Sequence, residues 1–220
     1  MPTVVIASPK GGAGKSTTAI LLATELAHAG ANVTVLDCDP NNSVSIWADR
    51  SPLPERLTTL ADVGESEIVK TIKARDTDGH VVIVDLEGVA SRLVSRAISQ
   101  ADLVITPMRA TTLDATIGAR ALLLIAEEEE ALSRKIPHAV VFTMTRTVQS
   151  RQHKGIEDSL RSQGIDIIEP SLMERAAFSA LFEFGGDLRT MPQQGNMEGA
   201  RQNASRFAQA VYERLARVAG

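Results

Sequence analysis

The chain has 220 residues, 44% of them hydrophobic and 23% charged, which is typical of a soluble globular protein with a core of its own. One cysteine excludes a disulfide framework and a metal site built from cysteines alone, and an aromatic content of 3% argues against a protein that stacks single-stranded bases. The net charge is −4, so nucleic acid binding would need a local basic patch, which oligomerisation can assemble.

The N-terminal segment is apolar but short, and it carries neither a basic leader nor a cleavage site of the secretory kind. No apolar run approaches the ~18 residues that a membrane-spanning helix needs. We therefore expect a cytoplasmic protein without a stable membrane association.

Short apolar runs alternate with longer segments of helical periodicity along the chain. Starting with a strand and then alternating, the expected elements span Thr3–Ser8, Lys15–Ala29, Val33–Asp37, Asn42–Arg50, Arg56–Val63, Ser66–Ala74, Val81–Asp85, Ser91–Gln100, Leu103–Thr106, Ala115–Leu132, Ala139–Met144, Gln149–Gln163 and Ile165–Ile168, followed by helices over Glu174–Phe184 and Met197–Val218. Pro107 should stop the strand that begins at Leu103. Strands alternating with helices predict a doubly wound, mostly parallel sheet with helices on both faces. We expect a single α/β domain over residues 1–220, because no repeat or linker interrupts the pattern.

A phosphate-binding loop is predicted over residues 8–17, which read Ser-Pro-Lys-Gly-Gly-Ala-Gly-Lys-Ser-Thr. The loop lies between a predicted strand and a predicted helix, which is the context that such a loop requires. Glycines let backbone N–H groups approach phosphate oxygens, and the N-terminus of the following helix adds a partial positive charge. The backbone expected to hold the phosphates is that of Gly11, Gly12, Ala13 and Gly14.

Three side chains at the start of the predicted helix complete this site. Lys15 is expected to reach the β- and γ-phosphates, Ser16 to ligate Mg²⁺ and Thr17 to reach the α-phosphate. The chain contains no Asn-Lys-x-Asp motif for reading guanine, which favours ATP over GTP. The sequence therefore predicts ATP and Mg²⁺ as the bound ligands.

The loop departs from the strict pattern at its start, where Pro9 replaces the first glycine and Lys10 follows it. In this respect residues 10–17 resemble the deviant Walker A motif of the ParA/MinD ATPases. The compact length resembles the short ParA subgroup and the VirC-type ATPases of conjugative DNA transfer. The resemblance implies weak intrinsic ATP hydrolysis and a homodimer that forms around bound ATP. It also implies that Lys10 crosses the dimer interface to the partner's nucleotide, whereas a solvated surface lysine is the alternative.

Carboxylates follow two predicted strands at their carboxyl ends, where open α/β sheets bind ligands. Asp37 and Asp39 belong to a segment that resembles the family's Asp-x-Asp-Pro-Gln. The resemblance assigns Asp39 to position the attacking water and Asp37 to the outer shell of the metal; a turn or helix-cap role is the alternative for both. Asp85 ends a strand of four apolar residues in a Walker-B-like element and would bind a Mg²⁺-linked water. Glu87 stands where the family usually has proline.

The resemblance extends through the second half of the chain. Residues 104–108 and 112–114 look like the family's next strand and the Leu-Asp start of the helix after it. Residues 141–146 resemble the strand whose end meets the adenine, which assigns Thr143 and Thr145 to the base, although many relatives carry asparagine there. Residues 171–178 and the Gly185-Gly186 loop occupy the place of the family's C-terminal base-contacting loop.

Basic residues of the last third of the chain are candidates for non-specific DNA binding through phosphates. They fall on two predicted helices: Arg151, Lys154 and Arg161 on one, and Arg206, Arg214 and Arg217 on the other. Solvated surface charge is the alternative for all six. By the resemblance, DNA binding would depend on the ATP-bound dimer, and a ParB-like or other adaptor protein would stimulate hydrolysis.

Two other functions remain open at this point. Phe207, Val211, Leu215 and Val218 form an apolar stripe on the last predicted helix, which either packs on the core or, as in a MinD-like regulator, binds a membrane. A metabolic ligase with a phosphate-binding loop is the third possibility, and it would need a pocket for a small substrate. Such an enzyme would have no use for Lys10.

Overall fold

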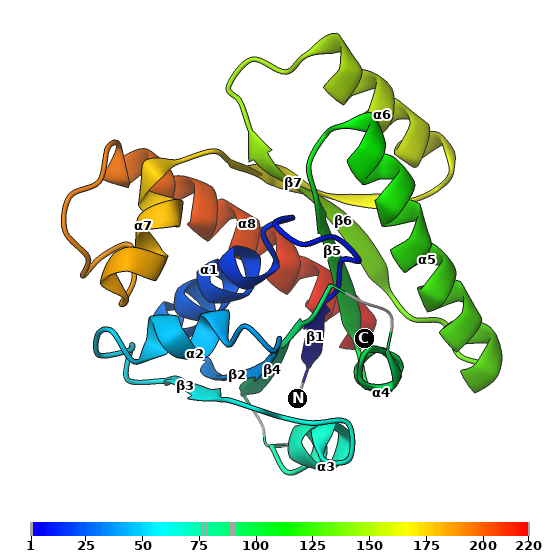
Figure 1. Cartoon of the computed structure of the whole chain (residues 1–220), viewed down its shortest axis with the longest axis horizontal. Helices are drawn as coiled ribbons and strands as arrows, with labels where there is room; N and C mark the ends of the chain where they lie inside the picture. The colour runs from blue at the N-terminus through cyan, green and yellow to red at the C-terminus, as the bar shows by residue number, and fades with distance from the viewer. Residues whose placement is uncertain (1, 76, 78, 89–90, 220) are drawn as a thin grey trace.

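The computed structural model describes residues 2–75, 77, 79–88 and 91–219. Within them one parallel sheet has the order β3-β2-β4-β1-β5-β6-β7 (Figure 1). Its strands are β1 (Thr3–Ile6), β2 (Asn32–Cys38), β3 (Leu57–Leu60), β4 (His80–Leu86), β5 (Leu103–Met108), β6 (His138–Thr145) and β7 (Asp166–Met173). The predicted doubly wound α/β fold is therefore confirmed.

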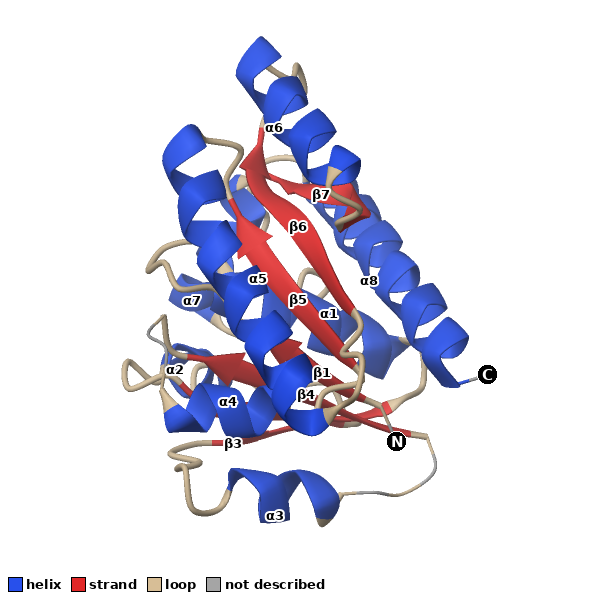
Figure 2. Ribbon diagram, turned by 90° about the vertical axis from the view of Figure 1, so that its right-hand side faces the viewer, coloured by secondary structure: helices blue, strands red, loops and turns tan. Residues whose placement is uncertain are grey.

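Helices cover both faces of the sheet (Figure 2). One face carries α1 (Lys15–His28), α2 (Ser43–Ala48), α7 (Ala176–Phe184) and α8 (Met197–Ala219). The other face carries α3 (Ile68–Lys73), α4 (Arg92–Ile98), α5 (Thr112–Leu132) and α6 (Arg151–Ser162). The central strands are apolar on both sides because each face is buried: Val4 and Ile6 of β1 pack toward α1, and Val5 packs toward α4 and α5.

The sheet register aligns the polar ends of three neighbouring strands. Ile6, the last residue of β1, lies beside Asp85 of β4, and Asp85 lies beside Asp37 of β2. Both carboxylates are thereby level with the point where the chain leaves β1 for the phosphate-binding loop. This is the crevice at the carboxyl ends of the strands in which open α/β sheets bind their ligands.

Among the predicted boundaries that differ from the structure, two have a clear physical reason. Pro107 lies inside β5 rather than ending it, and it pairs in register with Val141 of β6. The Ile105 carbonyl accepts a hydrogen bond from Ala7, so the main-chain polar groups of Ile105 point toward β1, as do those of Pro107 two residues later. Since β1 has ended there, no ladder bond is lost by the missing N–H of proline.

The second error concerns β7, which was expected to end at Ile168. The strand continues to Met173 after a register shift against β6, and α7 begins at Ala176. Much of the segment predicted as a base-contacting loop, residues 171–178, is therefore regular strand and helix. A strand prediction from apolar pattern alone misses this extension because Glu169, Pro170 and Ser171 interrupt the pattern.

Candidate nucleotide-binding site

The phosphate-binding loop joins β1 to α1 in a conformation that only glycine adopts easily. Gly12 and Gly14 have φ values of 71° and 90°, and α1 begins directly at Lys15 without a side-chain cap. The first N–H groups of α1 are thus left without a capping side chain and are available to an anion. Arg109 donates from Nη2 to the Gly12 carbonyl at 3.1 Å, which ties the loop to the end of β5.

Lys15 points into the crevice at the sheet edge and is 7% exposed. Gly88, which follows β4, closes against the loop: a Cβ atom there would lie 3.4 Å from the Gly11 nitrogen and 3.5 Å from Lys15 Nζ. A side chain at position 88 would therefore crowd the Lys15 ammonium. The loop, Lys15 and the segment after β4 therefore meet at one place.

The two aspartates of the β2 end differ in their surroundings. Asp37 is fully buried, and its Oδ2 accepts hydrogen bonds from the backbone N–H and the hydroxyl of Ser45, both at 2.8 Å. Asp37 therefore holds the first turn of α2 to the sheet. Asp39 is half-buried, and its Oδ1 accepts from the backbone N–H and the side-chain amide of Asn41.

Asp85 has no hydrogen-bond partner among the described residues for either carboxylate oxygen, although it is fully buried. The pKa of Asp85 is raised to about 7: burial is the main cause, the charges of Asp37 and Asp39 add to it, and the Ser16 hydroxyl and the Lys15 ammonium oppose it. Buried polar groups normally have partners, so an orphaned carboxylate beside a phosphate-binding loop fits a cation or its water shell. Ser16 and Asp85 are the residues that would hold Mg²⁺. The described residues contain no cluster of three or more acidic, histidine or cysteine side chains with the geometry of an all-protein metal site.

We expect Asp85→Asn to stabilise the nucleotide-free protein at pH 8. The pKa of Asp85 rises from 3.8 to about 7 on folding, so the folded chain holds this proton more tightly than the unfolded chain. Ionised Asp85 therefore destabilises the folded state increasingly from about pH 4 to about pH 7, by up to roughly 4 kcal/mol. Urea unfolding in EDTA should show the variant to be more stable at pH 8 and equal to the wild type near pH 4. Parallel pH profiles of the two proteins would contradict this reading.

Thr143 and Thr145, which were predicted to meet adenine, both use their hydroxyl groups inside the protein. Thr143 Oγ1 donates to the Ala13 carbonyl at 2.8 Å, and Thr145 Oγ1 lies 2.9 Å from the Ser171 hydroxyl. Thr143 thus supports the phosphate-binding loop from behind. Beside it lies a narrow cavity of about 50 Å³, which Thr17, Met173 and Arg175 help to line.

Lys10 forms an ion pair within its own chain. Its Nζ lies 2.6 Å from Oδ1 of Asp114, and the two side chains are 30% and 3% exposed. Asp114 is in the first turn of α5, and its backbone N–H donates to the Thr111 hydroxyl, which caps that helix. Lys10 is therefore not a freely solvated lysine in this conformation.

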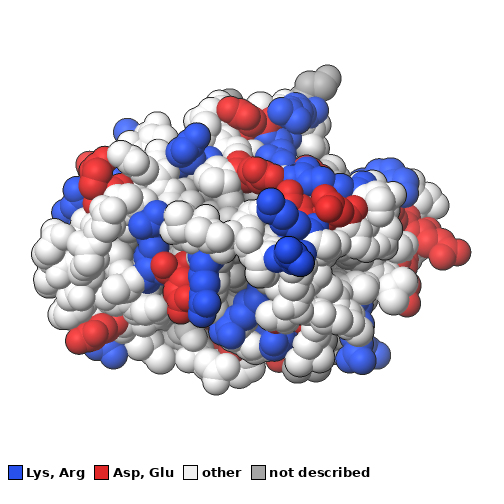
Figure 3. Space-filling view, turned by 90° about the horizontal axis from the view of Figure 1, so that it is seen from above, with Lys and Arg blue, Asp and Glu red and all other residues white. Residues whose placement is uncertain are grey.

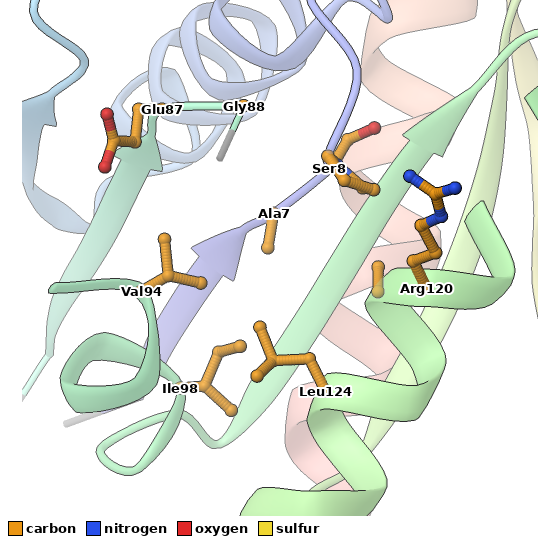
Figure 4. A pocket seen from close by; sticks show the side chains of 10 residues that line it. Ala7, Ser8, Glu87, Gly88, Val94, Ile98, Arg120 and Leu124 are labelled. Carbon is orange, nitrogen blue, oxygen red and sulfur yellow. The ribbon is translucent and has the colours of Figure 1, made fainter. Parts of the chain in front are cut away.

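A second cavity, of about 310 Å³, lies on the α4/α5 side of the loop (Figure 4). Val94, Ile98 and Leu124 form its apolar floor, and Glu87 and Arg120 stand at opposite sides of it. Gly88 also lines this cavity, so it borders the crevice that holds Lys15.

Residues 4–188 match the family described as the CobQ/CobB/MinD/ParA nucleotide binding domain. The chain belongs to this family. It is 64% identical over 217 residues to Protein ParA of Rhizobium radiobacter, with 98% of each chain covered. It is 25% identical over 191 residues to Protein virC1 of Rhizobium rhizogenes, with 84% of this chain and 82% of that relative covered. A solved ATP complex of a Cyanothece McdA variant has a TM-score of 0.77 at 19% identity, with 98% of this chain and 96% of that chain covered.

The predicted resemblance to ParA/MinD and VirC proteins is thus confirmed, and the chain is a ParA/MinD-type P-loop protein. The site residues that the structure brings together at the crevice are Lys15, Ser16, Asp37, Asp39 and Asp85. Arg109, which contacts the phosphate-binding loop, was not predicted from the sequence. Its position at the end of a predicted strand beside the loop was the available signal.

The six basic candidates of this ParA/MinD-family chain fall into two groups. Arg161 is paired with Glu157 and Glu169, and Arg214 makes two hydrogen bonds to Asp166. The other four make no ion pair with any residue that the structure describes: Arg151, Lys154, Arg206 and Arg217. At these four positions an external phosphate would compete with no ion pair of the described residues, although Arg217 lies near enough to Asp166 to lower the pKa of that carboxylate.

The apolar stripe of α8 packs on the core at three of its four positions. Phe207, Val211 and Leu215 are at most 6% exposed, whereas Val218 is 43% exposed. Burial confirms the core interpretation for the first three residues. None of the described helices is both long and apolar enough to cross a membrane.

Proposed function

We propose that this protein is a DNA partition or positioning ATPase. It binds ATP with Mg²⁺, dimerises around the nucleotides, binds double-stranded DNA without sequence preference, and is reset by slow hydrolysis that a ParB-like adaptor stimulates. The observation that carries the proposal is the buried Lys15 in a phosphate-binding loop opposite the unpartnered carboxylate of Asp85. The 64% identity to Protein ParA supports partition, and the McdA complex supports ATP as the nucleotide. A cytoplasmic, nucleoid-associated location is part of the same proposal.

Each side chain of the crevice has a part in this chemistry. The loop backbone and Lys15 bind the phosphates, and Ser16 and Asp85 would hold Mg²⁺, whose charge offsets that of the β- and γ-phosphates. Asp37 adds negative charge beside the metal while it fixes α2. Asp39, held by Asn41 at the start of the α2 segment, orients the attacking water.

The two alternatives are separated by simple experiments. A MinD-like membrane regulator would share the crevice, but the apolar stripe of α8 is largely committed to the core. Co-sedimentation with ATP should give DNA binding and no liposome binding.

A ligase would use the cavity of Figure 4 for its substrate, yet the cavity is mostly apolar, because it is lined by Ala7, Val94, Ile98, Ala121 and Leu124. ATP turnover that required a small co-substrate, and not DNA or an adaptor, would favour that function.

We expect Asp39→Ala to separate ATP binding from ATP hydrolysis. Among the described residues the Asp39 carboxylate accepts hydrogen bonds only from Asn41, so its removal leaves the loop and Asp85 in place. Loss of a group that positions water typically slows the reaction by roughly 10²-fold or more. Calorimetry should show ATP affinity within a few-fold of the wild type, phosphate release should fall, and the ATP-bound dimer should accumulate. The matched control Asp49→Ala, an exposed aspartate at the end of α2, should hydrolyse normally; unchanged turnover of Asp39→Ala would move the role to Glu87.

A further inference from the structure

A cleft of about 450 Å³ opens at the carboxyl ends of β5 and β6, on the side of the molecule that carries α6. Its walls are the loop after β5, which includes Arg109 and Thr111, and the loop after β6, which includes Arg146 and Gln149. Arg109 also donates to the Gly12 carbonyl, so the cleft adjoins the phosphate-binding loop without being part of it.

The cleft is rich in hydrogen-bond donors and has no acidic wall. Its two charged arginines, Arg109 and Arg146, are exposed, and neither makes an ion pair with any residue that the structure describes. The remaining polar lining consists of hydroxyl groups, the amides of Gln149 and Gln152, and one histidine; none of the lining residues that the structure describes is Asp or Glu. Two uncompensated guanidinium groups facing one space favour a ligand that carries several negative oxygens.

The helix α6 begins at the rim of the same cleft. Ser150 lines the cleft and caps the helix by accepting a hydrogen bond from the His153 N–H, so the positive end of a 12-residue helix faces this region. Arg151 and Lys154, both exposed, continue the basic surface along its first turns. Seen from above, basic side chains on this side of the molecule are interspersed with acidic ones (Figure 3). A cleft without carboxylates is therefore a distinct feature of a surface that carries both signs of charge.

We propose that this cleft binds backbone phosphates of double-stranded DNA through Arg109 and Arg146, with Arg151 and Lys154 extending the contact along α6. The assignment rests on the proposed DNA-binding function and names the residues that carry it. A polymer with regularly spaced phosphates matches both the paired arginines and the basic row that continues beyond the cleft. Since Arg109 donates to the Gly12 carbonyl, the cleft is also in direct contact with the proposed nucleotide-binding loop.

The deciding experiment uses the full chain with Mg²⁺ and a non-hydrolysable ATP analogue, and a fluorescent 30-base-pair duplex of arbitrary sequence. Anisotropy titrations at several salt concentrations compare the wild type with Arg146→Glu and Arg109→Ala. Lys73→Glu is the matched control, because Lys73 is an exposed residue of α3, on an element that does not line the cleft. Binding of a fluorescent ATP analogue is measured for every variant.

Arg146→Glu should weaken DNA binding at least roughly tenfold, and its salt dependence should be shallower by about one unit in the log–log slope. Arg109→Ala should also weaken DNA binding, whereas Lys73→Glu should bind DNA within about twofold of the wild type. Arg146→Glu should bind the nucleotide analogue as the wild type does. If the wild type binds no DNA with the analogue present, the proposed function itself fails. If the wild type binds DNA and Arg146→Glu binds it equally well with an unchanged salt slope, the cleft assignment is overturned. A parallel titration with poly-glutamate tests the other ligand. If Arg146→Glu retains DNA binding but loses binding of poly-glutamate, the cleft is assigned to an acidic protein segment instead.

Discussion

Lys15→Ala is expected to reduce ATP affinity by roughly 100-fold or more. The ammonium is the one cation that lies inside the crevice opposite Asp85 among the described residues, and it sits where the loop, Gly88 and the start of α1 converge. Charge-assisted hydrogen bonds to phosphate contribute about 1.5–3 kcal/mol each, and every 1.4 kcal/mol is a factor of about ten in affinity. Titration calorimetry with ATP and Mg²⁺ measures the change.

The control for this loss lies five residues earlier in the same loop. Lys10→Ala removes an ammonium of equal charge whose partner is Asp114, so it should leave ATP binding by the monomer within a few-fold of the wild type. A Lys15→Ala protein that bound ATP as tightly as the wild type would exclude residues 10–17 as the nucleotide site. Thermal melting without nucleotide establishes that both variants are folded.

The sheet and its loop could be predicted from the sequence because their signals are local. Apolar runs of strand length between helical segments predict the topology, and the glycine-rich loop between a strand and a helix predicts where phosphate binds. The structural role of a residue that bonds to a distant partner could not be predicted in this way. Asp37 is bonded to Ser45, which is eight residues away on α2, and no local pattern in the sequence predicts that contact.

The threonines of β6 illustrate a second limit. The family resemblance assigned Thr143 and Thr145 to the base together, and a regular strand would send both side chains to one face. Register shifts on both sides of Thr143, and a φ of 52° at Met144, disturb the alternation. Thr143 consequently contacts the phosphate-binding loop and Thr145 contacts β7.

The pairing of surface charges is a third feature that the sequence predicts only in part. Arg161 pairs with Glu157 four residues earlier on α6, a partner that the spacing alone could have indicated, and also with Glu169 of β7. Arg214 is bonded to Asp166 of β7, which no local pattern links to its helix. The partners that come from β7 can therefore be recognised only in the folded chain.

Substitutions of Lys10 and of Asp114 should change ATP-dependent dimerisation in opposite directions. Two triphosphates brought face to face repel each other, and a lysine from each subunit placed against the partner's nucleotide offsets part of that repulsion. Lys10 is engaged with Asp114 of its own chain at 2.6 Å, so it must leave this carboxylate before it can cross an interface. Lys10→Ala should therefore bind ATP as a monomer and lose ATP-dependent dimerisation together with DNA binding.

Asp114→Asn should act in the other direction. The amide keeps the size of the side chain at the start of α5 but removes the charge that holds Lys10, so the ATP-bound dimer should form at a protein concentration lower by roughly tenfold, the change that about 1.4 kcal/mol produces. Sedimentation velocity with a non-hydrolysable ATP analogue compares the two variants with the wild type, and Lys73→Ala serves as a control for loss of an exposed lysine. Should Lys10→Ala dimerise and bind DNA as the wild type does, Lys10 takes no part in the interface. Should Lys10→Ala fail to dimerise while Asp114→Asn behaves as the wild type, Lys10 acts across the interface but its pairing with Asp114 does not restrain it, because the free energy of breaking the pair is then balanced by solvation of the two separated charges.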